Sequence, residues 1–156
     1  LALDSQLCFA LYAASLAMTK AYKPLLAPLG LTYPQYLVML VLWEGDGITV
    51  SQLGERLTLD SGTLTPLLKR LEALALLQRL RDPTDERRVL LRLTDSGQTL
   101  RAAALAVPQA IACATACDLQ QVSALASQLH QLRRQLQDTV SPVVAPATGT
   151  TAPPRA

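Results

Sequence analysis

The sequence predicts a mainly α-helical protein with a small β-hairpin (α+β), organised as a winged helix-turn-helix. Leucine and alanine, both strong helix formers, abound in a chain that is 50% hydrophobic and only 4% aromatic. Helix-start signals recur along it, and two short strand-like stretches flank a polar turn directly after two closely spaced helices. The 156 residues are enough for one domain with a sizeable core.

The first predicted element is a helix over about 4–28. Asp4 or Ser5 can cap its start, and apolar residues recur at helical spacing along it. Pro24 lies inside this pattern and predicts a kink or an early end, and Gly30 is the stop signal.

Three further helices follow, each with its own start signal. Capping boxes, in which glutamine follows threonine by three residues, begin at Thr32 and Thr49, and Asp60 or Ser61 can cap the third helix. The expected ranges are about 34–43, 50–57 and 61–76. The tight turn between the last two helices predicts a helix-turn-helix unit, and the nearly all-apolar first one should be buried.

A hairpin and more helices complete the prediction. Two short strands at about 77–81 and 89–93 enclose a polar turn, and a hairpin in this place is a wing. Thr94 caps a long helix to about residue 116, in which Pro108 predicts a kink. Asp118 caps a last helix with a coiled-coil-like seam formed by Val122, Leu125, Leu129, Leu132 and Leu136.

The chain is expected to be a single unit over 1–140. Its tail, 141–156, is rich in proline, threonine, alanine and glycine and is predicted to be disordered.

The helix at 61–76 is the candidate recognition helix. Such a helix offers short polar side chains to base edges and cations to phosphates. The candidates of these two kinds are Ser61, Thr63, Thr65, Lys69 and Arg70. The segment at about 48–93 therefore predicts DNA binding.

The hairpin tip adds two arginines. Arg87 and Arg88 can enter a narrow minor groove, where the negative potential is strongest, and Asp85 could hold Arg87 by a fork-like ion pair. The alternative is that the two arginines merely lie on a solvent-exposed hairpin and that the threonines only cap the start of a helix. The succession of capped helix, tight turn, polar helix start and basic hairpin favours DNA binding.

Composition and charge limit which other classes of protein the chain can belong to. A net charge of +2 is too small to indicate nucleic-acid binding by itself. One histidine and three cysteines without a CxxC pair argue against a zinc site, and we expect no cofactor. No apolar run is long enough for a bilayer and no signal peptide is evident, so the cytoplasm is the expected compartment. Permanent disulfides are not expected there.

Several stretches resemble a known family. The wing sequence DPTDERRV followed by LTDSG is similar to that of the MarR family of bacterial regulators. The N-terminal stretches LCFALYA, YKPLL and LGLTYPQY resemble the family's organic hydroperoxide resistance regulators, and the resemblance covers about 3–137. It implies a repressor of a peroxidase gene, bound to a pseudo-palindromic operator as a homodimer built by the helices at about 4–28 and 94–137.

The resemblance also implies a redox site. The cysteine matching Cys8 is the peroxide sensor, and tyrosines matching Tyr22 and Tyr33 hydrogen-bond it from the partner subunit. Tyr12 and Tyr36 match further tyrosines near that site.

A second cysteine defines a subtype of these regulators. Cys113 fits the resolving position, so the resemblance implies that Cys8 is oxidised to a sulfenic acid and then forms an intersubunit disulfide that releases DNA. Cys117, one turn further along, is an alternative resolving residue.

The chemistry of Cys8 points the same way. Peroxides are attacked by thiolates, and the start of a helix favours an anion. An apolar surround suits an organic hydroperoxide, and its expected members are Phe9, Leu11, Met18, Met39 and Trp43. The alternative for Cys8 is an inert, buried thiol. The alternative for Tyr22 and Tyr33 is ordinary helix packing with a polar tip.

Other functions remain as competitors. A repressor of the same fold could respond to a small phenolic ligand between its domains, independently of Cys8. A thiol peroxidase would need a recycling motif, and none is evident, so we expect a regulator and not an enzyme. A helical scaffold without a DNA role is the third alternative.

Overall fold

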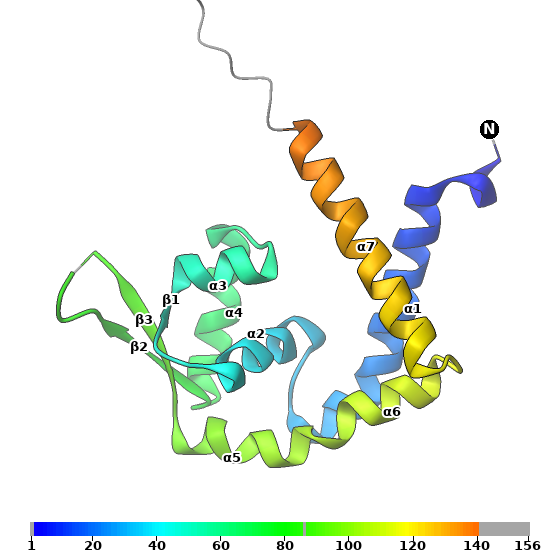
Figure 1. Ribbon diagram of the computed structural model, residues 1–156. Coiled ribbons are helices and arrows are strands. Elements are labelled where there is room, and N and C mark those ends of the chain that lie inside the picture. The colour runs from blue at the N-terminus through cyan, green and yellow to red at the C-terminus, as the bar shows by residue number, and fades with distance from the viewer. Residues whose placement is uncertain (1, 86, 141–156) are drawn as a thin grey trace, which may run out of the picture. The chain divides into compact units, whose positions relative to one another are not determined.

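The computed structural model describes residues 2–85 and 87–140. They form two compact units, one up to Thr115 and one from Ala116 onward. Figure 1 shows the elements in chain order: η1 (Leu3–Ser5), α1 (Leu7–Leu26), η2 (Ala27–Leu29), α2 (Tyr33–Glu44), β1 (Ile48–Thr49), α3 (Val50–Leu57), α4 (Ser61–Ala73), β2 (Leu77–Arg81), β3 (Val89–Leu93), α5 (Asp95–Ala104), α6 (Ala106–Ala114) and α7 (Leu119–Val140). The predicted fold class is confirmed.

Helix α1 begins later than predicted. Asp4 and Ser5 lie in the 3-10 turn η1, and the N-cap of α1 is Gln6, which makes no side-chain capping hydrogen bond. An N-cap needs extended backbone, whereas η1 has already turned the chain at the two expected caps. The helix runs past Pro24 to Leu26 without the predicted early end.

The helix-turn-helix follows the prediction closely. At the start of α3 the Thr49 N–H donates to Gln52 Oε1 at 2.8 Å, and the Gln52 N–H donates to Thr49 Oγ1 at 3.1 Å. At the start of α4 the Thr63 N–H donates to Asp60 Oδ1 at 2.9 Å. Helix α4 ends at Ala73, short of the predicted 76, because Ala75 turns left-handed with φ 55°.

The sheet has the predicted hairpin and one further strand. Strands β2 and β3 are antiparallel with Arg79 opposite Leu91, and their bounds are those predicted. Strand β1 was missed because two residues are too few to show alternation. It pairs with β3, Ile48 opposite Leu91, so the order is β1-β3-β2.

The predicted long helix after Thr94 is two helices. It breaks at Leu105, between α5 and α6, and not at Pro108 itself. Pro108 has no N–H to donate to the carbonyl of Ala104, and its ring crowds that carbonyl, so the ladder fails one turn before the proline.

The core surrounds α2. Seven of its residues are buried, as predicted, together with leucines from α3, α4 and the hairpin. The Trp43 indole N–H donates to the carbonyl of Gly97 at 2.8 Å. A Cβ on Gly97 would lie 2.0 Å from the carbonyl oxygen of Leu76, so only glycine allows α5 to start this close to the end of α4.

Helix α7 belongs to the second unit. Asp118 caps it as predicted, accepting the Gln121 N–H at 2.7 Å. Four of the five predicted seam residues are exposed. The predicted tail, 141–156, lies outside the described residues. Among those that are described, no single helix is long and apolar enough to cross a membrane; only the bent pair Leu7–Leu29 and Tyr33–Glu44, at 68°, meets the length and composition criteria jointly.

Candidate nucleic-acid interface and redox residues

The start of α4 presents the predicted recognition residues to solvent. All five are exposed: Ser61, Thr63, Thr65, Lys69 and Arg70. The opposite face of the same helix buries Leu64, Leu68 and Leu71 in the core. One face is therefore free for a partner while the other fixes the helix.

Two threonine hydroxyls on this face donate their protons locally. Thr65 Oγ1 donates to the carbonyl of Ser61 at 2.7 Å, and Thr63 Oγ1 donates to Asp60 Oδ2 at 3.1 Å. Each oxygen keeps lone pairs that can accept a hydrogen bond. In this state the two hydroxyls can accept from base amino groups.

The wing turn differs from the predicted ion pair. Asp85 accepts the backbone N–H of Arg87 at 3.1 Å, but its carboxylate pairs with the guanidinium of Arg88 at 3.4 Å. The expectation that Asp85 holds the Arg87 guanidinium is therefore wrong. Once the tight turn sends the Arg87 N–H to Asp85, the side chain three positions on comes within reach of the carboxylate.

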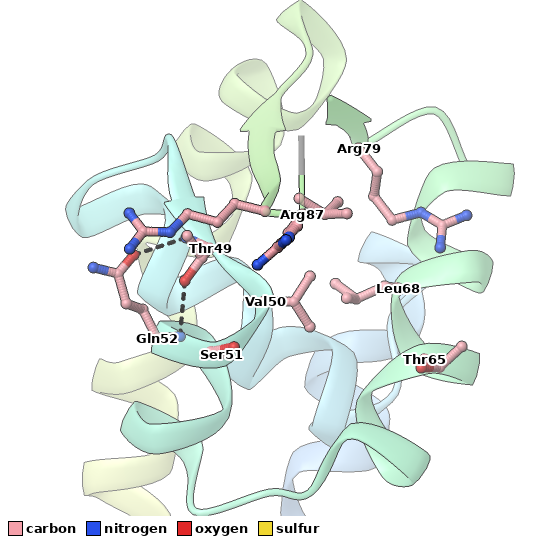
Figure 2. Close-up of a pocket in the computed structure, with 10 residues that line it drawn as sticks. Thr49, Val50, Ser51, Gln52, Thr65, Leu68, Arg79 and Arg87 are labelled. Atoms are coloured by element: carbon pink, nitrogen blue, oxygen red, sulfur yellow. Dashed lines mark hydrogen bonds between the residues drawn. The ribbon is translucent and has the colours of Figure 1, made fainter. Parts of the chain in front are cut away.

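A groove of about 530 Å³ joins the wing to the helix-turn-helix. Its lining includes Thr65 and the predicted Arg87 and Arg88, and adds the first turn of α3 and Arg79. Figure 2 shows Arg87 reaching over Val50, with Thr49, Ser51 and Gln52 beside it. The capping box made these α3 residues look purely structural in the sequence.

Arg79 was also missed, although one signal was present. It stands two residues after buried Leu77 on β2 and so lies on the same face of the strand, which is unusual for a cation. Its guanidinium donates to Glu72 Oε2 from Nε at 3.0 Å and from Nη2 at 2.6 Å. The pairing lowers the pKa of Glu72.

Three of the predicted redox tyrosines form a cluster. The ring of Tyr22 on α1 lies 4.6 Å from that of Tyr33 and 5.9 Å from that of Tyr36, both on α2. Tyr36 in turn meets Trp43 edge-on at 6.3 Å. Burial raises the pKa of all three phenols, and neighbouring Tyr33 adds to this at Tyr22 and Tyr36. They are therefore protonated donors at neutral pH.

Cys8 and Tyr12 lie apart from this cluster. Cys8 is the second residue of α1, and both residues are exposed. Residues four apart share a helix face, so Tyr12 is the near neighbour of Cys8. Tyr22 is fourteen residues along the same helix, about 21 Å away at 1.5 Å per residue. One chain therefore does not bring Cys8 to the tyrosine cluster.

The other two cysteines, and two of the apolar residues expected around Cys8, lie on other elements than Cys8. Cys113 near the end of α6 and Cys117 after it are both exposed. Met39 and Trp43, expected near Cys8, are buried in the core on α2. Within the described residues no group of histidine, cysteine and carboxylate side chains could hold a metal ion.

Comparison with known proteins places this fold. The profile of the family described as transcriptional regulator SarA/Rot matches residues 20–103. The chain is 50% identical over 145 residues to the HTH-type transcriptional regulator TtmR of Methylorubrum extorquens, covering 93% of this chain and 74% of the relative. It is 55% identical over 109 residues to the organic hydroperoxide resistance transcriptional regulator of Bacillus subtilis, covering 70% and 74%.

A solved structure agrees with these relatives. Reduced AbfR bound to DNA, a protein also solved from Staphylococcus epidermidis, matches with a TM-score of 0.71 and 37% identity over 86% of this chain and 93% of that one. Other structures of AbfR show it overoxidised on DNA and in a disulfide form. The chain belongs to the SarA/Rot family of transcriptional regulators, whose fold is the MarR-like winged helix-turn-helix.

Proposed function

We propose that the chain is a homodimeric repressor that binds a pseudo-palindromic DNA operator when reduced and leaves it when an organic hydroperoxide oxidises Cys8. The observation that carries the DNA-binding part is the exposed, capped start of α4 beside an arginine-bearing hairpin. A helix of this polarity fits the major groove, and the wing arginines fit the adjacent minor groove or backbone.

Band-shift titration with a promoter fragment from the protein's own genomic neighbourhood tests this binding. Lys69→Ala should lower the slope of log affinity against log salt by about 0.9, since one phosphate contact is lost. The control Arg134→Ala, on α7, should leave the slope unchanged. Equal slopes for Lys69→Ala and the wild type would show that Lys69 binds no phosphate and would contradict this part of the proposal.

In the proposed sensing step the chain supplies the two sulfur atoms and the organic hydroperoxide supplies the oxygen. The Cys8 thiolate attacks one peroxide oxygen, the O–O bond breaks, and the alcohol leaves, which makes Cys8 a sulfenic acid. The thiol of Cys113 in the partner subunit then attacks the Cys8 sulfur. A disulfide forms and water leaves.

The length of α1 supports a site shared between subunits. Tyr22 of the same chain is about 21 Å from Cys8, so hydrogen bonds from the cluster to this sulfur require a second chain. Exposed apolar residues on α1, including Leu7 and Leu16, are the surface that such a dimer would bury. The name of the Bacillus subtilis relative favours organic hydroperoxides over other oxidants.

Release of DNA would follow from the symmetry of the dimer. Two recognition helices must lie about 34 Å apart to enter successive major grooves. A new bond between the subunits would rotate the two DNA-reading parts relative to each other and spoil both half-sites together.

Two assays test the switch. Cys8→Ser protein should stay on its promoter fragment after cumene hydroperoxide, whereas the wild type leaves it. In non-reducing electrophoresis a covalent dimer should require Cys8 and Cys113, and Cys117→Ser should leave it intact. Release of the Cys8→Ser protein would overturn the sensor, and loss of the dimer in Cys117→Ser alone would reassign the resolving residue.

A second candidate is supported by a separate cavity. About 210 Å³ between α2 and the α5–α6 break is lined by Tyr36, Trp43 and Arg101 among others. Glu44 also lines the cavity, but its carboxylate is paired with Arg56, which leaves Arg101 and the aromatic walls to take a phenolic carboxylate. Salicylate should then release DNA equally from the wild type and Cys8→Ser, and Arg101→Ala should abolish that response.

A further inference from the structure

The junction between α4 and the wing is closed by one carboxylate. Besides its guanidinium bonds, Arg79 donates its backbone N–H to Glu72 Oε1 at 3.3 Å. Strand β2 is an outer strand of the sheet, and this N–H bonds to Glu72 on its open edge and not to β3. Glu72, in the last turn of α4, therefore holds both the edge of the wing and the charge of Arg79.

The three groove arginines are held to very different degrees. Arg79 is bound through two guanidinium nitrogens, and its side chain is 32% exposed. Within the described residues Arg88 has one ion-pair contact, to Asp85 at 3.4 Å, and its side chain is 63% exposed. Among the described residues Arg87 has no ion-pair partner. Figure 2 shows Arg79 turned towards α4 and away from Arg87, although both line the groove.

A neutralised arginine contributes little to binding the DNA backbone. Contacts to phosphate strengthen binding to every sequence alike, so each one raises non-specific affinity as much as specific affinity. Arg79 lies beside a groove that already carries two freer arginines, and Glu72 keeps it from becoming a third.

We propose that Glu72 limits the protein's affinity for DNA of any sequence: it withholds Arg79 from the DNA backbone, so that contacts at this groove rest on α4 and the wing tip. This inference rests on the proposed DNA binding. Arg79 in this arrangement is a positioning residue that holds the wing against α4 and touches no phosphate.

A double-mutant cycle on reduced, full-length protein tests it. Affinity for the promoter fragment and for a scrambled duplex is measured from about 50 to 200 mM salt for the wild type, Glu72→Gln, Arg79→Gln and the double variant. Glu72→Gln should steepen both salt slopes by about 0.9, so its affinity falls about threefold more than that of the wild type over this range. Its preference for the promoter fragment over the scrambled duplex should stay unchanged, because the added phosphate contact strengthens binding to both duplexes alike.

The other variants supply the controls. Arg79→Gln should keep the wild-type slope, and the double variant should return to it. Unchanged slopes in Glu72→Gln would make Glu72 a brace only and overturn the inference. A lower slope in Arg79→Gln would show that Arg79 already binds a phosphate, and it overturns the inference even if Glu72→Gln does not fold.

The proposed function and this inference fail in different ways. Wild-type protein that binds neither duplex overturns the proposed function, and this inference with it. Wild-type binding with none of the expected slope changes overturns this inference alone.

Discussion

The DNA-reading segment and helix α1 contrast within the same unit. In α3 and α4, Leu53, Leu64 and Leu71 are at most 1% exposed. In α1 only Leu26 is buried, and Leu7 and Leu16 are 59% and 45% exposed. The first segment completes its packing within one chain, whereas the second leaves apolar surface uncovered.

This difference matches the two parts of the proposed function, which are DNA binding and peroxide sensing. The DNA-reading segment is held by caps, a hairpin and a shared core, so its geometry needs no partner. Helix α1 carries Cys8 on a surface that only another molecule can cover. The DNA-reading segment is thus complete in one chain, whereas the proposed sensor would need two.

The largest expected effect is seen when a buried leucine of α4 is compared with an exposed leucine of α1. Leu71→Ala should lower the free energy of unfolding by about 2–5 kcal/mol, because it leaves a cavity in the core. Leu16→Ala should leave the stability of the chain itself nearly unchanged but weaken the proposed dimer. Urea denaturation at two protein concentrations separates these outcomes, because only dimer loss depends on concentration. An equal loss for both variants would erase the contrast.

A smaller loss is expected at the start of α5. Thr94 Oγ1 accepts the Gly97 N–H at 3.0 Å and donates to the carbonyl of Ala75 at 2.6 Å. Thr94→Ala should cost about 1–2 kcal/mol of unfolding free energy, since both bonds are lost. Thr94→Ser keeps the hydroxyl and should cost much less, which thermal denaturation would show.

A stabilising change is expected just after the end of α4. Ala75 adopts φ 55°, a left-handed conformation that glycine reaches without strain. Ala75→Gly should raise the unfolding free energy by about 0.5–1 kcal/mol. The same change at Ala73, inside α4, should lower it. A loss at both positions would contradict the left-handed helix end.

The smallest expected effect is a dependence on pH. Hydrogen bonds from Thr63 lower the pKa of Asp60 in the folded protein. The stability that this carboxylate contributes is therefore full above its unfolded pKa, near 4, and is lost as pH falls through the folded value. Asp60→Asn keeps a good N-cap without titrating. The two proteins should match at pH 7, and the wild type should lose more stability on acidification.

Much of the DNA-reading segment could be predicted from the sequence, because residues close together in the chain determine where its helices and strands begin and end. Thr49, Gln52 and Asp60 determine where α3 and α4 begin through bonds that span three residues. The bounds of β2 and β3 follow from two short strand-like stretches around a polar turn. These features depend on neighbours in the sequence, so a pattern suffices.

The missed features depend on tertiary contacts or on competing local geometry. Strand β1 exists only because Ile48 meets Leu91, and Arg79 faces Glu72 across the end of α4. Asp85 pairs with Arg88 and not with the expected Arg87, because the tight turn determines which side chain the carboxylate reaches. The candidate redox site could not be assembled from one chain at all, since Cys8 and Tyr22 lie far apart on the same helix.

The indole of Trp43 gives the molecule a built-in optical probe. It is the chain's only tryptophan, it donates to Gly97 at the start of α5, and it meets the ring of Tyr36 edge-on. Its emission therefore arises from a single place, where the tyrosine cluster meets the helix that follows the wing. Any rearrangement between those two parts changes the polarity around one fluorophore, so the protein can be followed in solution without a label.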